Sequence, residues 1–253
     1  MDISKLIQIK DLIPSITEIK GLNSTSYSPS DTWKVKLRGK GVTRVFLKMF
    51  INVENNKNTE GLKYETKIYN YLKDIQDTVD CFPKYYNTFE CNYKDLVKLL
   101  ENSMGKEQAT DVVKRNGMYM KNRLKGRPSI TDTTKGNPVG DNLQKISSSD
   151  TYTVLMTEDF SSKTKTLDNY ITNNSRMDEE RVDLISQVIY SFYILEQNSI
   201  NHNDVHFDNI FVAERNKIQN VSVTGYRSRY RVVLYDFDLS YKEGFPNKNI
   251  DSR

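Results

Sequence analysis

Alternation of apolar and polar residues in the first half of the chain predicts strands. Residues 33–37 (Trp-Lys-Val-Lys-Leu) alternate with a period of two, and residues 44–50 form a second run of residues that favour strands. A Gly-Lys-Gly sequence at 39–41 lies between the two runs and favours a hairpin turn. Residues 82–91 and 152–156 predict two further strands in the same part of the molecule.

Apolar residues at helical spacing predict two helices. In residues 60–73, Leu62 and Ile68 share a face with other apolar side chains. Residues 178–197 give the clearest helical pattern, with acidic residues at the start that suit the positive helix N-terminus. We expect the apolar stripe of this second helix to lie in the core; it consists of Ile185, Val188, Ile189, Phe192 and Leu195. Two short strands, at 210–212 and 231–235, are predicted to follow it around a polar hairpin.

The stretch at about 92–150 differs from the rest in charge and composition. It contains 11 basic and 7 acidic residues, and its second half is rich in Pro, Gly, Ser, Thr and Asp. We expect a short helix at about 93–103 and then a mostly flexible basic insertion. The basic run at 114–127 is interpreted as a solvated face, with a docking site for an acidic partner as the alternative.

Length and composition narrow the class of protein. The chain has 253 residues, enough for one large domain or two lobes, and its net charge of +4 does not indicate a nucleic-acid-binding protein. No apolar run approaches the ~18 residues that span a bilayer, and residues 1–20 do not resemble a signal peptide. Cys81 and Cys91 are expected to be free thiols in a reducing compartment, so we expect a cytoplasmic protein.

Two polar motifs in the last quarter of the chain carry the candidate chemistry. The segment His-Asn-Asp-Val-His-Phe-Asp-Asn at 202–209 lies between the predicted helix at 178–197 and a predicted strand. Asp236-Phe-Asp238 follows the next predicted strand. Asp and Asn also favour turns, so a purely structural role is the alternative for each motif taken alone. Their fixed order, with a strand lysine and a helix glutamate upstream, favours a functional role.

The order of these motifs resembles that in the protein-kinase-like superfamily. The catalytic loop of that superfamily has Asp and Asn five residues apart and is followed by an Asp-Phe-Gly metal motif. The histidine two residues after the loop aspartate is similar to that of haspin-like kinases, divergent kinases of large DNA viruses, and aminoglycoside and choline kinases. The resemblance covers about residues 16–241. It implies an α+β, bilobal fold, with a β-rich N-lobe in residues 1–156 and a shortened helical C-lobe in residues 157–253.

The resemblance implies ATP and Mg²⁺ as cofactors and a role for each motif residue. Asp204 would accept the proton of the attacking hydroxyl. Asn209 and Asp236 would hold Mg²⁺, which prefers oxygen ligands. Lys48 would hold the α- and β-phosphates and be oriented by Glu65.

The resemblance also implies roles for two histidines of the loop and for four residues upstream of it. His206 would donate a hydrogen bond toward the γ-phosphate, and His202 would brace the loop through backbone contacts. Thr157 and Glu158 lie in a segment that looks like the hinge beside the adenine pocket. Ser24 and Ser26 would face phosphate from residues 21–28, where a single glycine replaces the glycine-rich loop.

Three departures from the family pattern bear on function. Asn203 replaces the loop arginine that often reads a phosphorylated activation segment, so we expect no such switch. Asp238 replaces the glycine of the metal motif, which removes a flexible backbone position. Because 15 residues follow Asp238, we expect the C-lobe to be short.

The function expected from the resemblance is that of an ATP-dependent kinase acting on Ser or Thr hydroxyls of proteins. A small-molecule kinase of the aminoglycoside or choline type is one alternative, favoured by His206 and the serine-rich loop. A pseudokinase or binding scaffold acting through the basic insertion is another, favoured by the missing glycine loop and the short C-lobe. We expect a protein substrate as partner, and neither a specific nucleic acid nor a membrane span.

Overall fold

The computed structural model describes residues 6, 8–22, 30–38, 44–54, 56–124, 147, 149–159, 164–173, 178–220, 227–245 and 247. The chain forms two compact units, the first made of Met1–Lys63 and Tyr86–Glu158 and the second of Tyr64–Tyr85 and Asp159–Arg253. Helices and strands occur in both units, so the fold class is α+β. The lobe boundary expected at 156 and 157 lies two residues before the end of unit 1, but residues 64–85, expected in the N-lobe, belong to unit 2.

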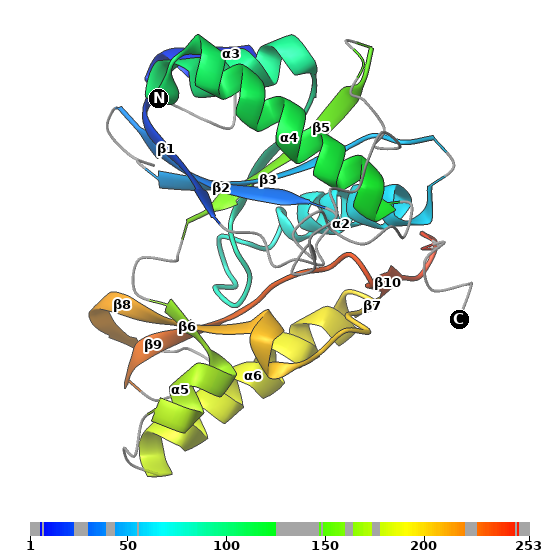
Figure 1. The fold of residues 1–253 in the computed structure, drawn as a ribbon. Coiled ribbons are helices and arrows are strands. Elements are labelled where there is room, and N and C mark those ends of the chain that lie inside the picture. The colour runs from blue at the N-terminus through cyan, green and yellow to red at the C-terminus, as the bar shows by residue number, and fades with distance from the viewer. Residues whose placement is uncertain are drawn as a thin grey trace, which may run out of the picture. The chain divides into compact units, whose positions relative to one another are not determined.

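Unit 1 is built on a five-stranded sheet with the order β1-β2-β3-β5-β4 (Figure 1). The pairs β1–β2, β2–β3 and β3–β5 are antiparallel. The strands predicted at 33–37, 44–50, 82–91 and 152–156 are confirmed, while the turn predicted at 39–41 lies outside the described residues. The strands are β1 (Ile16–Leu22), β2 (Asp31–Leu37), β3 (Arg44–Ile51), β4 (Tyr85–Asn92) and β5 (Thr151–Glu158).

Three helices pack with this sheet into one apolar core: α1 (Ile9–Leu12), α3 (Tyr93–Met104) and α4 (Lys106–Leu124). The helix predicted at 93–103 is confirmed as α3, which begins at a capping box formed by Asn92 and Asp95. It ends at Gly105, whose φ of 79° is a conformation that glycine adopts readily.

Helix α4 corrects the expectation of a mostly flexible insertion. Residues 106–124 are helical because four apolar side chains with spacings of four, seven and four residues lie in the core of unit 1. Many charged residues between them hid this pattern in the sequence. The buried side chains are Ala109, Val113, Met120 and Leu124.

Unit 2 combines helices with two small sheets, of order β6-β8-β9 and β10-β7. The helices predicted at 60–73 and 178–197 are confirmed as α2 and α6. The strand predicted at 210–212 lies in the longer strand β8, and the strand predicted at 231–235 corresponds to β9, which ends at Leu234. The division between the units falls within α2. The elements are α2 (Lys57–Leu72), β6 (Thr164–Thr166), α5 (Leu167–Asn173), α6 (Asp178–Gln197), β7 (Ile200–Asn201), β8 (Ile210–Asn220), β9 (Arg227–Leu234) and β10 (Tyr241–Lys242). Every helix in the described part of the chain is too short or too polar to span a bilayer.

The apolar stripe predicted as the core face of α6 is only partly buried. Leu195 is 2% exposed, whereas Ile185 is 57% and Ile189 is 63% exposed. The helix instead buries the polar side chains of Asp183 and Gln187. The prediction was wrong for Ile185 and Ile189 because hydrogen bonds to β9, rather than apolar packing alone, set the rotation of α6.

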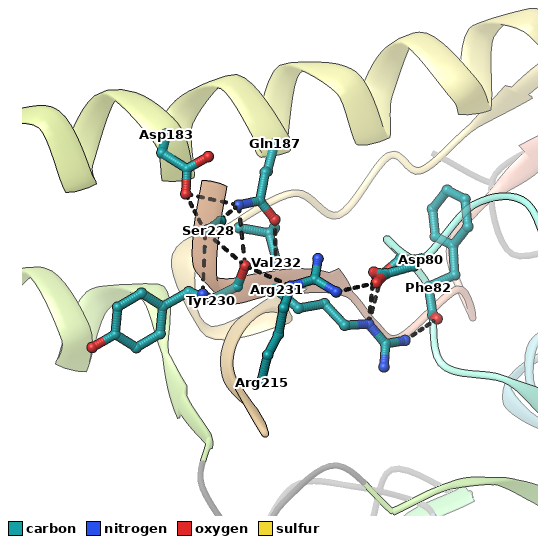
Figure 2. A network of polar contacts seen from close by, with 9 residues as sticks. All are labelled: Asp80, Phe82, Asp183, Gln187, Arg215, Ser228, Tyr230, Arg231 and Val232. Atoms are coloured by element: carbon teal, nitrogen blue, oxygen red, sulfur yellow. Dashed lines mark hydrogen bonds and ion pairs between the residues drawn. The ribbon is translucent and has the colours of Figure 1, made fainter. Parts of the chain in front are cut away.

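Figure 2 shows the hydrogen bonds that hold α6 against β9. Gln187 Nε2 donates to Asp183 Oδ2 at 3.0 Å and to the carbonyl of Tyr230 at 3.2 Å. Gln187 Oε1 accepts from the backbone N–H of Val232 at 3.1 Å, and Ser228 Oγ donates to the Asp183 carboxylate. These bonds satisfy buried polar groups that would otherwise cost free energy, and they fix one side of β9.

Two arginines tie the segment 80–82 to the neighbouring strands in the same view (Figure 2). Arg231 donates from Nε to the carbonyl of Asp80 at 2.6 Å and from Nη2 to that of Phe82 at 2.7 Å. Arg215 pairs with the Asp80 carboxylate. The backbone N–H of Leu234, the last residue of β9, donates to the carbonyl of Cys81 at 2.9 Å. The end of β9, from which Asp236 follows, is therefore anchored at several points.

Both cysteines are free and buried, as the sequence predicted for its two thiols. Burial raises the pKa of Cys81 and that of Cys91 to about 12. Both side chains therefore stay protonated at neutral pH and contribute as small apolar groups.

Candidate active site

Hydrogen bonds within the loop after α6 bring Asp204 and Asn209 together. Asn209 Nδ2 donates to the backbone carbonyl of Asp204 at 3.0 Å and to its Oδ2 at 3.2 Å. The backbone N–H of Asn209 donates to the carbonyl of His206 at 3.0 Å, closing a short 3₁₀ turn. Because the amide nitrogen of Asn209 faces Asp204, its Oδ1 is the atom left to accept a ligand.

The segment that carries Asp236 is bonded to this loop through its neighbour Tyr235. The backbone N–H of Tyr235 donates to the carbonyl of Asn209 at 3.0 Å, and its own carbonyl accepts from His202 Nε2 at 3.0 Å. Asp236 itself has a φ of 66°, a left-handed conformation that is uncommon for a residue other than glycine. The backbone links therefore place Asp204, Asn209 and Asp236 in one part of unit 2.

Phe237 anchors the next position of the same segment. Its side chain is 0% exposed and packs against three rings, with centroid distances of 5.2 Å to Tyr69, 6.0 Å to Phe82 and 4.8 Å to His202. Because Phe237 directly follows Asp236, this packing restricts where the Asp236 carboxylate can lie. The left-handed backbone at Asp236 is thus held between a hydrogen-bonded residue and a fully buried one.

His202 braces the loop through the backbone of Tyr235, as the sequence predicted. It is 2% exposed, and because a carbonyl can only accept, its Nε2 carries the proton. Its Nδ1 is buried with no hydrogen-bond partner among the described residues. Burial lowers the pKa of His202, and the bond to Tyr235 and the charges of Asp236 and Asp204 oppose this in part.

The lowered pKa of His202 predicts that acid destabilises unit 2. The unfolded chain, with an ordinary histidine pKa near 6.5, binds the proton before the folded state does. The free energy of unfolding should therefore fall as the pH drops below about 6.5 toward the lower folded pKa. The measurement is urea unfolding at pH 7.5 and pH 5.5.

His202→Gln retains a donor for the Tyr235 carbonyl but cannot take up a proton in this range, so it should weaken the pH dependence. His206→Gln is the matched control, because His206 is the second of only two histidines and its side chain is 50% exposed. The difference between the two variants gives the part of the pH dependence that comes from the buried histidine. The same pH dependence in His202→Gln and the unmodified protein would contradict the assignment.

His206 lies between two carboxylates on the solvent side of the loop. Its Nε2 is 3.8 Å from Asp204 Oδ2, and its Nδ1 is 3.8 Å from Asp208 Oδ2. The half-exposed ring leaves part of its surface open to a ligand. His206 is therefore close to the carboxylate of Asp204 and remains accessible.

In unit 1, the strand register decides which of the expected nucleotide contacts share a face of the sheet. Lys48 lies in β3 opposite Leu155 of β5, and Phe46 lies opposite Thr157. Residues directly opposite each other on paired strands point to the same face of the sheet, and so do alternate residues of one strand. Lys48 and Thr157 therefore point to the same face. Glu158 lies opposite Val45 and therefore points to the other side.

Lys48 is 6% exposed, and Glu65, on the part of α2 assigned to unit 2, is 0% exposed. Both are buried, which is unusual for these residue types. Ser24 and Ser26 lie outside the described residues.

The oxygen donors of the loop fit a Mg²⁺ ion that is held in part by substrate. In the described part of the chain, no group of three or more His, Cys, Asp or Glu side chains is arranged to hold a metal. Asp236 and the free Oδ1 of Asn209 instead offer one carboxylate and one amide oxygen. Mg²⁺ commonly binds one or two carboxylates together with waters and substrate phosphates, so the donor set suits a metal–nucleotide complex.

No protein-family model matches the chain, and no curated protein matches it.

Proposed function

We propose that the protein is an ATP-dependent kinase that transfers the γ-phosphoryl group to Ser or Thr hydroxyls of proteins. The observation that supports this best is the bonding of the Asp204 loop to the residue before Asp236, at 3.0 Å from Tyr235 N to the carbonyl of Asn209. Phosphoryl transfer depends mainly on positioning and charge neutralisation. A rigid frame that brings a carboxylate base beside a carboxylate and an amide oxygen suits that chemistry.

Each loop residue has a defined task in this proposal. Asp204 accepts the proton of the attacking hydroxyl, and Asn209 Nδ2, 3.2 Å from its Oδ2, orients the carboxylate. Asp236 and Asn209 Oδ1 hold Mg²⁺, which supplies positive charge to the phosphates when bound. His206 donates toward the transferred phosphoryl group.

The proposal extends to unit 1 through the shared sheet face of Lys48 and Thr157. Lys48 holds the α- and β-phosphates as a compact charge, and Thr157 contacts the adenine end of the nucleotide. Unit 1 then corresponds to the N-lobe and unit 2 to the C-lobe of a bilobal kinase. The two free thiols, Cys81 and Cys91, suit a reducing cytoplasm.

The proposal predicts magnesium-dependent transfer that requires Asp236. The purified chain is incubated with γ-labelled ATP, Mg²⁺ and a mixed protein fraction, and phosphoserine and phosphothreonine are measured on the fraction and on the chain itself. Asp236→Asn should lower transfer at least ~100-fold, because the only negative charge among the proposed metal ligands is lost. Asp74→Asn, which changes an exposed carboxylate of unit 2, should leave transfer unchanged.

Equal transfer by Asp236→Asn and the unmodified protein would remove the assigned role. Consumption of ATP with amino alcohols or aminoglycosides, but not with proteins, would indicate a small-molecule kinase instead. A protein that binds no magnesium–ATP in a calorimeter would be a pseudokinase or a scaffold.

A further inference from the structure

Hydrogen bonds to its backbone hold the segment that follows Asp236. Each of four consecutive carbonyls, from Phe237 to Ser240, accepts one. The carbonyl of Phe237 accepts from the N–H of Ser240 at 3.1 Å, and that of Leu239 accepts from Asn203 Nδ2 at 3.3 Å. Ser240 Oγ in turn donates to the carbonyl of His202 at 3.3 Å. The segment is therefore bonded to the loop at Leu239 and Ser240.

Asn247 supplies the two bonds that complete this set. Its Nδ2 donates to the carbonyl of Asp238 and to that of Ser240, each at 2.9 Å. Asn247 is 1% exposed although it lies in a polar part of the sequence. An amide that is buried and donates twice to a short turn determines the shape of that turn.

This turn directly follows Asp236, whose backbone is left-handed. A left-handed φ at a residue other than glycine is strained and persists only where its surroundings enforce it. On one side of Asp236, Tyr235 is bonded to His202 and Asn209. On the other side, residues 237–240 are bonded to Asn203 and Asn247.

We propose that Asn247 is a positioning residue that clamps residues 237–240 and thereby holds the Asp236 carboxylate ready for a divalent cation bound to nucleotide. This inference rests on the proposed function, since it assigns the cation to Asp236 and Asn209.

The test is the affinity of the protein for Mn²⁺ in the presence of a non-hydrolysable ATP analogue, measured from the free Mn²⁺ signal in electron paramagnetic resonance. Asn247→Asp keeps the size of the side chain and removes both donors. We expect it to weaken Mn²⁺ binding about 10- to 100-fold, as is typical for residues that orient metal ligands. Binding of the nucleotide without metal should change far less.

The matched control is Asn198→Asp, which removes a similar side-chain donor in unit 2, from Nδ2 to the carbonyl of Ile194 at 2.8 Å. It should retain Mn²⁺ affinity at a comparable melting temperature. If Asn247→Asp does not fold, the Mn²⁺ affinity of Asn203→Asp tests the clamp instead. Asn203 is exposed, and Asp tolerates its left-handed φ of 58°, so this variant should fold and lose Mn²⁺ affinity several-fold.

The outcomes separate this inference from the proposed function. Unchanged Mn²⁺ affinity in a folded Asn247→Asp, or in Asn203→Asp where that variant decides, would overturn the clamp and leave the kinase proposal standing. Metal affinity that depends on Asn247 in a protein that transfers no phosphoryl group would support the clamp and contradict the kinase proposal. An unmodified protein that does not bind the Mn²⁺–nucleotide complex would overturn both.

Discussion

Replacing Asp204 by asparagine is expected to lower phosphoryl transfer by about 10²- to 10⁴-fold, the usual contribution of a general base. The carboxylate is held by Asn209 Nδ2, 3.2 Å from Asp204 Oδ2, so it has a fixed orientation before substrate arrives. An asparagine at this position fills the same space but cannot accept the proton. The rate constant is measured under single-turnover conditions with saturating Mg²⁺ and ATP, where substrate affinity does not limit it.

Two comparisons make the result specific to Asp204. Asp77→Asn removes a carboxylate of the same unit whose side chain is 87% exposed and lies outside the loop, and it should leave the rate constant unchanged. Affinity for Mn²⁺ with an ATP analogue should persist in Asp204→Asn, because the proposed metal ligands are Asn209 and Asp236. A rate constant equal to that of the unmodified protein would remove Asp204 from the mechanism.

Replacing Phe237 by alanine is expected to destabilise unit 2 by about 3–5 kcal/mol. The side chain is 0% exposed and contacts the rings of Tyr69, Phe82 and His202, so its removal leaves a cavity that a packed interior fills poorly. This loss is a large part of the free energy that stabilises an ordinary domain. Urea unfolding followed by circular dichroism gives the change.

Phe207→Ala is the control for this substitution, because the Phe207 side chain is 55% exposed in the same unit. It should change the free energy of unfolding by less than about 1 kcal/mol. Trp33, the single tryptophan of the chain, lies in β2 and reports on unit 1 by its fluorescence. Equal urea midpoints for Phe237→Ala and Phe207→Ala would show that Phe237 is not the anchor described.

The helices, the strands and the turn that holds Asp204 and Asn209 could be predicted from the sequence, because each depends on residues that are close together in the chain. Period-two alternation at 33–37 and 44–50 predicted β2 and β3, and helical spacing predicted α2 and α6. The spacing of Asp204 and Asn209 placed them in one short turn, where a single amide bonds to both the backbone and the carboxylate of the aspartate. Such contacts span a few residues, so the chain order alone fixes them.

The tertiary structure decided the features that depend on distant partners. Ile185 and Ile189 are exposed on α6, while Gln187 is buried, because bonds to Val232 and Tyr230 outweigh the apolar pattern of the helix. A single asparagine at 247, one of 24 in the chain, gives no sequence signal for its two bonds to the turn after Asp236. The left-handed backbone of Asp236 likewise depends on contacts with residues that are distant in the sequence. Polar groups must be satisfied wherever the chain buries them, and their partners come from segments that only folding brings together.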